Sequence, residues 1–292
     1  MSLVIIPCHS VWKAAINDEN PLNLGQLPEH WVLAPFQLEG RDHFAMIKHG
    51  LQGVKTLVDT IGQDTSADAN NMLFFSGSKT KPQLNISEGE SYYKLIQKIL
   101  KFDEQVKPLS KIFDDPELVD LVHTIKNSVS DQVLDSFLST NVTYEECSLD
   151  SFDNLYYSLL KYHEMFSVYP KKIVVVGFEF KRKRFVYLHG RKALGIDIEY
   201  IGIDPKPIGL SPEQSKTYFD DLKFQESKNA LVPFEKDWYA VRKPLLDKKQ
   251  SRNPFGVVPS YPELISLHHP QVLEDREFFE SVVLSKYKNF EN

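Results

Sequence analysis

The chain has 292 residues, 42% of them hydrophobic and 25% charged, an ordinary globular balance that predicts a sizeable buried core. Its formal net charge of −6 argues against sequence-independent binding of nucleic acid, because such binding needs a basic surface that displaces counterions. Two cysteines, Cys8 and Cys147, are too few for a disulfide framework and lack metal-ligand spacing. No stretch approaches the length of a membrane span, and the apolar opening Leu3–Ile6 is too short for a signal peptide. We therefore expect a cytoplasmic protein that binds neither nucleic acid nor membranes, with no metal site.

Short apolar runs recur along the chain, and amphipathic segments lie between them. The runs occupy residues 3–6, 72–75, 142–145, 173–176 and 198–203, the third being the weakest. Runs of four to six residues without strong polar alternation are typical of strands buried on both faces of a parallel sheet. Helical spacing of apolar residues marks the intervening segments 44–61, 92–100 and 152–163. The alternation predicts an α/β fold with a Rossmann-like, doubly wound, mainly parallel sheet.

Two helix starts and two boundaries complete the predicted layout. Ser87–Glu90 has the pattern of a capping box, and Asp150 can cap the helix that follows it. The apolar pattern of residues 101–138 predicts a helical insertion before the weak third strand. From residue 206 onward prolines interrupt the pattern, so we predict a core over 1–205 and a wrapping C-terminal extension over 206–292.

Polar residues follow every predicted strand, and the carboxyl ends of parallel strands meet at one edge, where ligands of open α/β sheets bind. In chain order the segments that follow the strands are Pro7–Ser10, Ser76–Lys79, Glu145–Ser151, Gly177–Arg184 and Asp204. We expect them to converge in space and to bind a small anionic ligand.

The second and fourth of these segments have the chemistry of anion binding. Ser76–Gly77–Ser78 is a small-residue turn whose amides can approach a ligand closely. Four consecutive cations follow the fourth strand, and we expect Lys181 or Arg184 to contact a phosphate or carboxylate, with Arg182 and Lys183 facing water. An ordinary solvated basic turn is the alternative.

The remaining segments supply candidates for acid and base chemistry. His9 follows the first strand, where a structural role is the alternative. Glu145 ends the third strand and is a better candidate than Asp150, which we expect to cap a helix. We expect His189, within a helix over Phe185–Leu194, to lie at the surface.

Taken together, these segments resemble domain of unknown function 218, the family of the bacterial proteins SanA, ElyC and YdcF, over residues 3–205. The family pattern has an S-G-G-like turn, then S-E-A, then E-x-x-S-x-x-T-x-E-N, and finally a strand ending like S-x-F-H-x-x-R. The corresponding segments here are Ser76–Ser78, Ser87–Gly89, Glu145–Asn154 and Phe178–Arg184. The insertion and the proline-rich tail look like features of a eukaryotic, fungal branch.

The resemblance implies a Rossmann-like sheet with a polar pocket for a nucleotide-like or S-adenosylmethionine-like molecule, the cofactor itself being unknown. This chain departs from the family at Lys181, where the family often has histidine, at Ser151 in place of threonine and at Asp153 in place of glutamate. An exposed lysine is protonated at neutral pH, so a mechanism that needs the family histidine as a base is in doubt, whereas anion binding survives the change.

Three functions stay open. In the first, the protein is an enzyme of unspecified reaction, acting on a phosphorylated or nucleoside-containing substrate. The second is a non-catalytic binding or sensor module built on the same residues, and the third is a protein-interaction scaffold formed by the tail. The ligand-binding candidates are Ser76, Gly77, Ser78, Ser148, Ser151, Asn154, Lys181 and Arg184, and the catalytic candidates are Glu88, Glu145 and His9.

Overall fold

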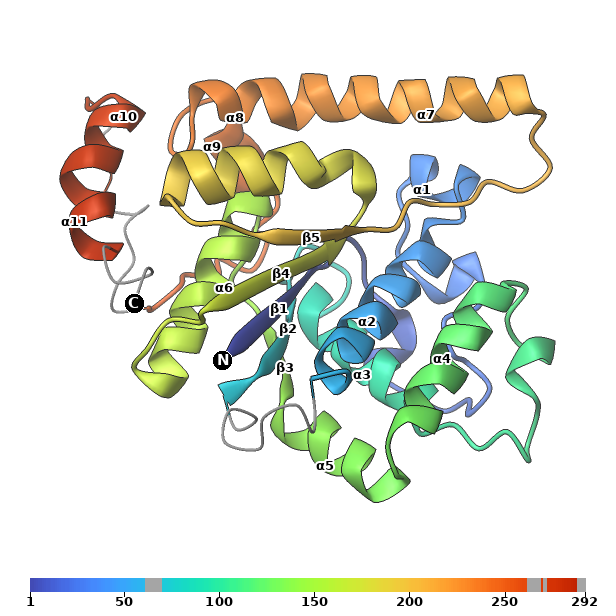
Figure 1. Ribbon diagram of the computed structural model, residues 1–292. Helices are drawn as coiled ribbons and strands as arrows, with labels where there is room; N and C mark the ends of the chain where they lie inside the picture. The colour runs from blue at the N-terminus through green and yellow to red at the C-terminus, as the bar shows by residue number, and fades with distance from the viewer. Residues whose placement is uncertain (61–69, 262–268, 270–271, 288–292) are drawn as a thin grey trace.

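The centre of the molecule is a five-stranded, entirely parallel sheet. The structure is a computed structural model that describes residues 1–60, 70–261, 269 and 272–287. The strand order is β3-β2-β1-β4-β5, and helices flank the sheet (Figure 1). The α/β fold predicted from the sequence is therefore confirmed. The strands are β1 (Ser2–Pro7), β2 (Met72–Ser76), β3 (Val142–Glu145), β4 (Lys172–Gly177) and β5 (Glu199–Gly202).

The apolar run of β1 explains its central place in the sheet. Its residues Leu3 to Ile6 have no exposed surface, because β2 and β4 pair on either side and helices cover both faces. Ile6 lies opposite Phe75 of β2, and Val4 lies opposite Val174 of β4. Side chains of a strand alternate between the two faces, so β1 contributes to both hydrophobic layers.

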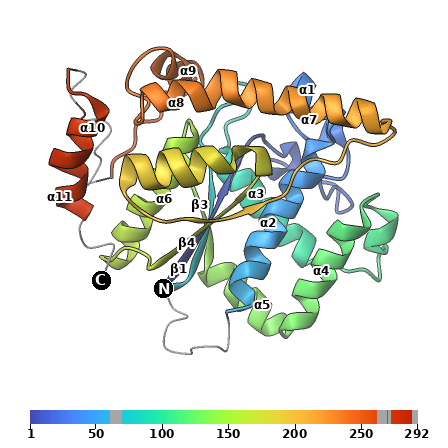
Figure 2. The ribbon, with the colours of Figure 1, turned by 45° about the horizontal axis from the view of Figure 1, so that its top comes forward.

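The helices divide between the two faces, as Figures 1 and 2 show. On one face, the core that contains Val4 and Ile6 is shared with α2 (Asp42–Val58), α3 (Glu88–Leu100), α4 (Pro116–Ser128) and α5 (Asp131–Thr140). On the other face, the core that contains Leu3 and Ile5 is shared with α6 (Ser151–Phe166) and a π-helix over Arg184–Leu194. Shorter elements are α1 (Pro35–Glu39) and the single 3-10 turns Lys13–Ala15, Pro28–His30, Leu109–Lys111 and Glu179–Lys181.

The segment after β5 packs on the rest of the chain. Phe234, Tyr239 and Phe278 are at most 2% exposed and belong to the core on the α6 face. In Figure 1, α7 runs along the β5 side of the molecule from near α1 to α8. The elements are α7 (Pro212–Glu226), a π-helix Ser227–Leu231, α8 (Val232–Lys236), α9 (Leu245–Ser251), α10 (Asp275–Phe278), a π-helix Phe279–Val283 and α11 (Leu284–Tyr287).

Some helix boundaries differ from those predicted. Ser87 caps α3 by accepting a hydrogen bond from the Glu90 amide at 2.9 Å, but the Glu90 carboxylate pairs with Lys94 on the next turn at 2.8 Å, so the expected reciprocal capping bond is absent. The helix expected over residues 44–61 ends at Val58, and Ile61 lies outside the described residues. Within the described part of the chain, no helix combines the length and the apolar character needed to cross a membrane.

Gly89 lets α3 begin close against the sheet edge. A Cβ at this position would lie 2.5 Å from the Phe75 carbonyl oxygen and 2.9 Å from that of Glu145. Since backbone cannot move aside cheaply, we expect Gly89→Ala to lower the free energy of unfolding by about 1–3 kcal/mol. Chemical denaturation followed by circular dichroism would measure it. Helix propensity alone predicts the opposite, a gain of roughly 0.5–1 kcal/mol, and a gain of that size would refute the packing constraint.

Candidate functional site

The ends of β1 and β4 meet where the strand order reverses, and one residue from each end contacts the other there. His9 follows β1 and Lys181 follows β4. The Lys181 Nζ lies 3.3 Å from Nε2 and 3.4 Å from Nδ1 of the His9 ring. That ring stacks on Phe178 at 5.1 Å, and the ammonium lies 4.9 Å from the Phe178 ring centre and 5.7 Å from that of Phe180. In open α/β sheets this reversal point is where ligands bind.

Both groups titrate abnormally. Burial, followed by the charge of Arg184, lowers the pKa of Lys181 to about 7. Burial also lowers the pKa of His9 well below its usual value, and the adjacent Lys181 charge acts in the same direction, so the His9 ring is neutral at neutral pH. The assumption of an exposed, always protonated Lys181 is therefore wrong. The side chain is partly buried on aromatic rings, which disfavours its charged form.

Glu145 is the centre of a second, fully buried group at the ends of β2 and β3. Its carboxylate accepts hydrogen bonds from the hydroxyls of Ser76, at 2.8 Å, and Ser148, from the Cys147 amide at 2.6 Å and from the Tyr261 hydroxyl at 3.2 Å. Burial raises the pKa of this carboxyl, and the hydrogen bonds act against the rise. With both oxygens engaged, Glu145 holds the loop after β3 in place.

Asn154 and the amides of the small-residue turn complete this packing. The Asn154 side-chain amide donates to the carbonyl and the hydroxyl of Ser76, both at 3.0 Å. The amides of Gly77 and Ser78 donate to the backbone carbonyls of Glu145 and Ser148, at 3.0 and 2.9 Å. Those two amides are thus already paired. The Ser78 hydroxyl is buried and has no hydrogen-bond partner among the described residues.

Glu88 lies between the two groups. It is 3% exposed at the start of α3 and accepts a hydrogen bond from the Thr80 hydroxyl. Burial raises the pKa of the Glu88 carboxyl, while the charges of Arg252, Lys81 and Lys181 counteract the rise. Glu88 and Glu145 both raise the pKa of the buried Cys8 thiol, after the larger effect of its own burial. The Glu88 carboxyl therefore interacts electrostatically with both Arg252 and Lys181.

Two predicted site residues have partners inside the protein. Arg184 Nε lies 3.0 Å from Oε1 of Glu226 at the end of α7, with both side chains about a tenth exposed. The Ser151 hydroxyl lies 2.7 Å from His189 Nε2. His189 is completely buried among Phe152, Phe185 and Phe234, so its expected surface placement is wrong. The π-helix shares a hydrophobic core with α6, and His189 lies on its buried face.

The segment around α9 adds residues that the sequence pattern did not reveal. Lys249 pairs with Asp150, at 3.0 Å, and with Asp153, at 2.9 Å, at the start of α6. Arg252 donates to the Leu149 carbonyl at 3.1 Å, and its charge lowers the pKa values of Lys181 and His9. Lys249 lies 96 positions from Asp153, and Arg252 lies 103 positions from Leu149, so no local periodicity marks them. In the sequence, these residues are marked only by the cluster of cations in 248–252.

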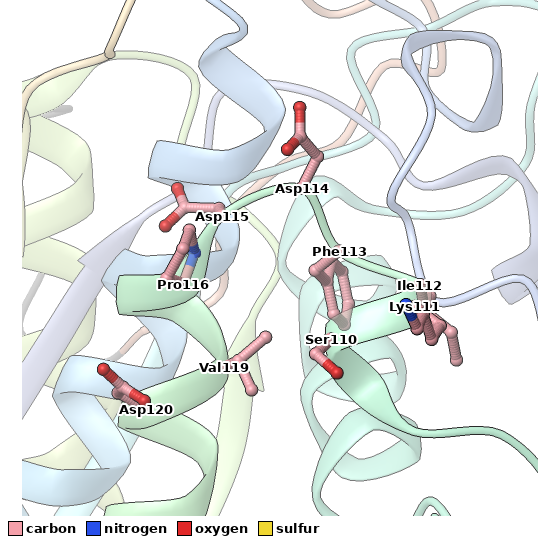
Figure 3. A pocket seen from close by; sticks show the side chains of 9 residues that line it. All are labelled: Ser110, Lys111, Ile112, Phe113, Asp114, Asp115, Pro116, Val119 and Asp120. Atoms are coloured by element: carbon pink, nitrogen blue, oxygen red, sulfur yellow. The ribbon is translucent and has the colours of Figure 1, made fainter.

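Predicted residues are in contact within two separate groups, one around Glu145 and one formed by His9 and Lys181, and two cavities of the described structure lie elsewhere. One, of about 380 Å³, is lined by the residues before and within the first turns of α4 (Figure 3). Another, of about 370 Å³, lies between the end of α2 and α5. Neither includes a sheet-edge residue. Among the described residues there is no group of three or more histidine, cysteine or acidic side chains arranged to hold a metal ion.

Comparison with known proteins identifies a relative. The chain is similar to Uncharacterized protein YOR238W of Saccharomyces cerevisiae, with 42% identity over 299 aligned residues that cover 98% of this chain and 96% of the yeast protein. The chain belongs to the YOR238W family. No protein-family model and no solved structure matches it. A function for the YOR238W family therefore has to be argued from the geometry of the site.

The Tyr261–Glu145 hydrogen bond ties the C-terminal segment to the sheet edge. We expect Tyr261→Phe to lower the free energy of unfolding by about 1 kcal/mol, because a buried carboxylate oxygen loses one of its donors. Urea denaturation would measure the change. Tyr187→Phe, at a tyrosine that is 53% exposed, is the matched control and should be neutral. Equal effects of the two substitutions would show that the hydrogen bond contributes nothing.

Proposed function

We propose that the protein binds a small anionic ligand, phosphorylated or nucleotide-like, at the carboxyl edge of the sheet between β1 and β4. The observation that carries this proposal is that Lys181 and Arg252, from distant parts of the chain, each have no carboxylate within ion-pair distance among the described residues, while the charge of Arg252 acts on Lys181. The positive charges of Lys181 and Arg252 repel each other, and a bound anion would offset this repulsion by attracting both.

Several further features support an anion at this place. The strand order reverses between β1 and β4, the usual ligand position in this architecture. The His9 ring is neutral and stacked on Phe178, and it can form a hydrogen bond to a ligand oxygen. Arg184 is engaged with Glu226, so we assign ligand contact to Lys181 and Arg252 rather than to Arg184.

The proposal extends to the chemistry around the ligand. Glu88 is the candidate for moving a proton, because Glu145 has both oxygens occupied by donors. Ser76, Ser148 and Asn154 hold the loop that carries Glu145 and would position it without contacting the ligand. Membership in domain of unknown function 218 and binding of a nucleotide or S-adenosylmethionine belong to this proposal, resting on the motif residues alone. A cytoplasmic location is supported by the two free cysteines.

A binding module without turnover is the second candidate. It is favoured by the close packing of the acidic residues: Glu145 has no exposed surface and Glu88 has 3%. In that case Glu88→Gln would leave the ligand affinity unchanged, and no product would form from the bound ligand.

Removing either unpaired cation should weaken anion binding. We expect Lys181→Met and Arg252→Gln each to lower the affinity for the best ligand of a thermal-shift panel of inorganic phosphate, sulfate, sugar phosphates, ATP and S-adenosylmethionine. A lost charge-assisted hydrogen bond, worth about 1.5–3 kcal/mol, corresponds to a roughly ten- to hundredfold loss. Lys183→Met, at an exposed lysine two positions away, is the control. If all three variants bind as the wild type does, the site is misassigned.

The protonation of Lys181 should make sulfate binding depend on pH. Sulfate keeps its charge between pH 6 and 8, and His9 and His49 stay neutral because burial lowers the pKa of each well below this range. Lys181, with a pKa of about 7, loses its charge over this interval, so sulfate affinity should fall several-fold as the pH rises. Isothermal titration calorimetry at pH 6, 7 and 8 would measure it. Lys181→Arg, which stays charged, should reduce the fall to the part caused by ionisation of the neighbouring Asp42 carboxyl, whose pKa is also about 7, and an unchanged fall would exclude Lys181 as its source.

A further inference from the structure

Lys181 differs from the buried lysines Lys48 and Lys249 in having no acidic partner among the described residues. Lys48 pairs with Asp115 at 2.7 Å, and Lys249 pairs with Asp150 at 3.0 Å. The Lys181 amine instead faces aromatic rings and the neutral His9 imidazole. A lysine in an apolar setting beside other cations is the usual arrangement for an amine that acts as a nucleophile.

Charged and titratable groups from every neighbouring element act on this amine. Arg184 and Arg252 disfavour its protonated form. Glu226 and Asp42 favour the protonated form of Lys181, but Glu226 is paired with Arg184. Burial raises the pKa of the Asp42 carboxyl to about 7, so about half of the Asp42 side chains are uncharged at neutral pH. The groups that interact electrostatically with Lys181 are His9, Asp42, His49, Glu88, Arg184, Glu226 and Arg252.

The outcome of these opposing effects is an amine that is neutral in a large fraction of molecules. With a pKa of about 7, roughly half of the Lys181 side chains carry a free lone pair at pH 7. For an ordinary lysine that fraction is less than about one in a thousand. Lys181 therefore offers a nucleophile at neutral pH without needing a separate base.

The geometry points to Lys181 as the nucleophile of an imine-forming site whose substrates are small phosphorylated aldehydes or ketones. This inference rests on the proposed function, in which Arg252, whose charge acts on the Lys181 amine, holds the phosphate while the carbonyl carbon lies against Nζ. It names the substrate class that the anion site alone leaves open: the ligand must carry both an anion and a reactive carbonyl.

The chemistry balances without a redox partner. The Lys181 lone pair attacks the carbonyl carbon, a C–N bond forms, and the C=O π bond breaks as a proton moves from nitrogen to oxygen. The resulting carbinolamine then loses its hydroxyl group as water, and a C=N bond replaces the C–O bond. The second amine proton leaves with the hydroxyl group as water, and the neutral His9 ring, 3.3 Å from Nζ, orients the amine.

Pyridoxal 5′-phosphate, used as a reagent, tests the inference because it carries an aldehyde and a phosphate. The full-length protein would be incubated with it at pH 7 and reduced with borohydride, and the modified lysines would be mapped by peptide mass spectrometry. We expect Lys181 to be labelled at least tenfold more than the exposed Lys183, and we expect a pH profile with its midpoint near 7. Lys181→Arg should lose this label, and Lys183→Met should keep it.

Pyridoxal without the phosphate separates the nucleophile from the anion site. Preferential labelling of Lys181 by the phosphate form supports both proposals, whereas equal labelling by the two reagents supports the nucleophile and contradicts the anion site. Thermal stabilisation by pyridoxal 5′-phosphate, lost in Arg252→Gln but without preferential labelling of Lys181, supports the anion site and overturns the imine. Labelling of Lys181 with the pH dependence of an ordinary lysine also overturns it.

Discussion

The reversal of strand order between β1 and β4 is the constraint on which the arrangement of the site depends. The chain leaves β1 toward α2 on one face and leaves β4 toward the π-helix Arg184–Leu194 on the other, so the two connections diverge from the ends of these neighbouring strands. His9 and Lys181 occupy these ends and meet within 3.3 Å. Because the neighbouring strands are buried on both faces, the sheet holds these residues in a fixed relation.

The polar residues at the sheet edge divide into two groups with different roles. Around Glu145, the side chains satisfy one another: Ser76, Ser148 and Tyr261 donate to the same carboxylate, and Asn154 donates to Ser76. A buried polar group of this kind rigidifies the loops that it joins. At the β1–β4 end, by contrast, Lys181 and Arg252 have no carboxylate within ion-pair distance among the described residues. The first group therefore supports the loops around the second, where a ligand would find unsatisfied charge.

The sequence predicted the sheet well because its signal is local. A strand buried on both faces must be continuously apolar, and the runs at residues 3–6 and 173–176 show this directly. The convergence of Ser76 with Glu145 followed from the parallel arrangement. The surroundings of individual side chains were harder to predict, because the burial of Lys181 and His189 depends on how the π-helix and the C-terminal segment pack. Arg252 and Lys249 reach the site from about a hundred residues away, and such contacts have no sequence period.

An unpaired lysine on aromatic rings is costly for the folded protein, since burial of a charge without an acid partner is unfavourable. The chain could relieve this cost with one carboxylate, as it does at Lys48 and Lys249. Two arginines act on Lys181 instead, one of them at the end of α9, while Glu226 and Asp42 also act on it but form no ion pair with it. A site that leaves cations uncompensated in the free protein gains the most when an anion binds, because the ligand then supplies the missing charge. The free energy that the unpaired Lys181 costs the free protein is recovered when an anion binds, and this connects the stability of the fold with the proposed function.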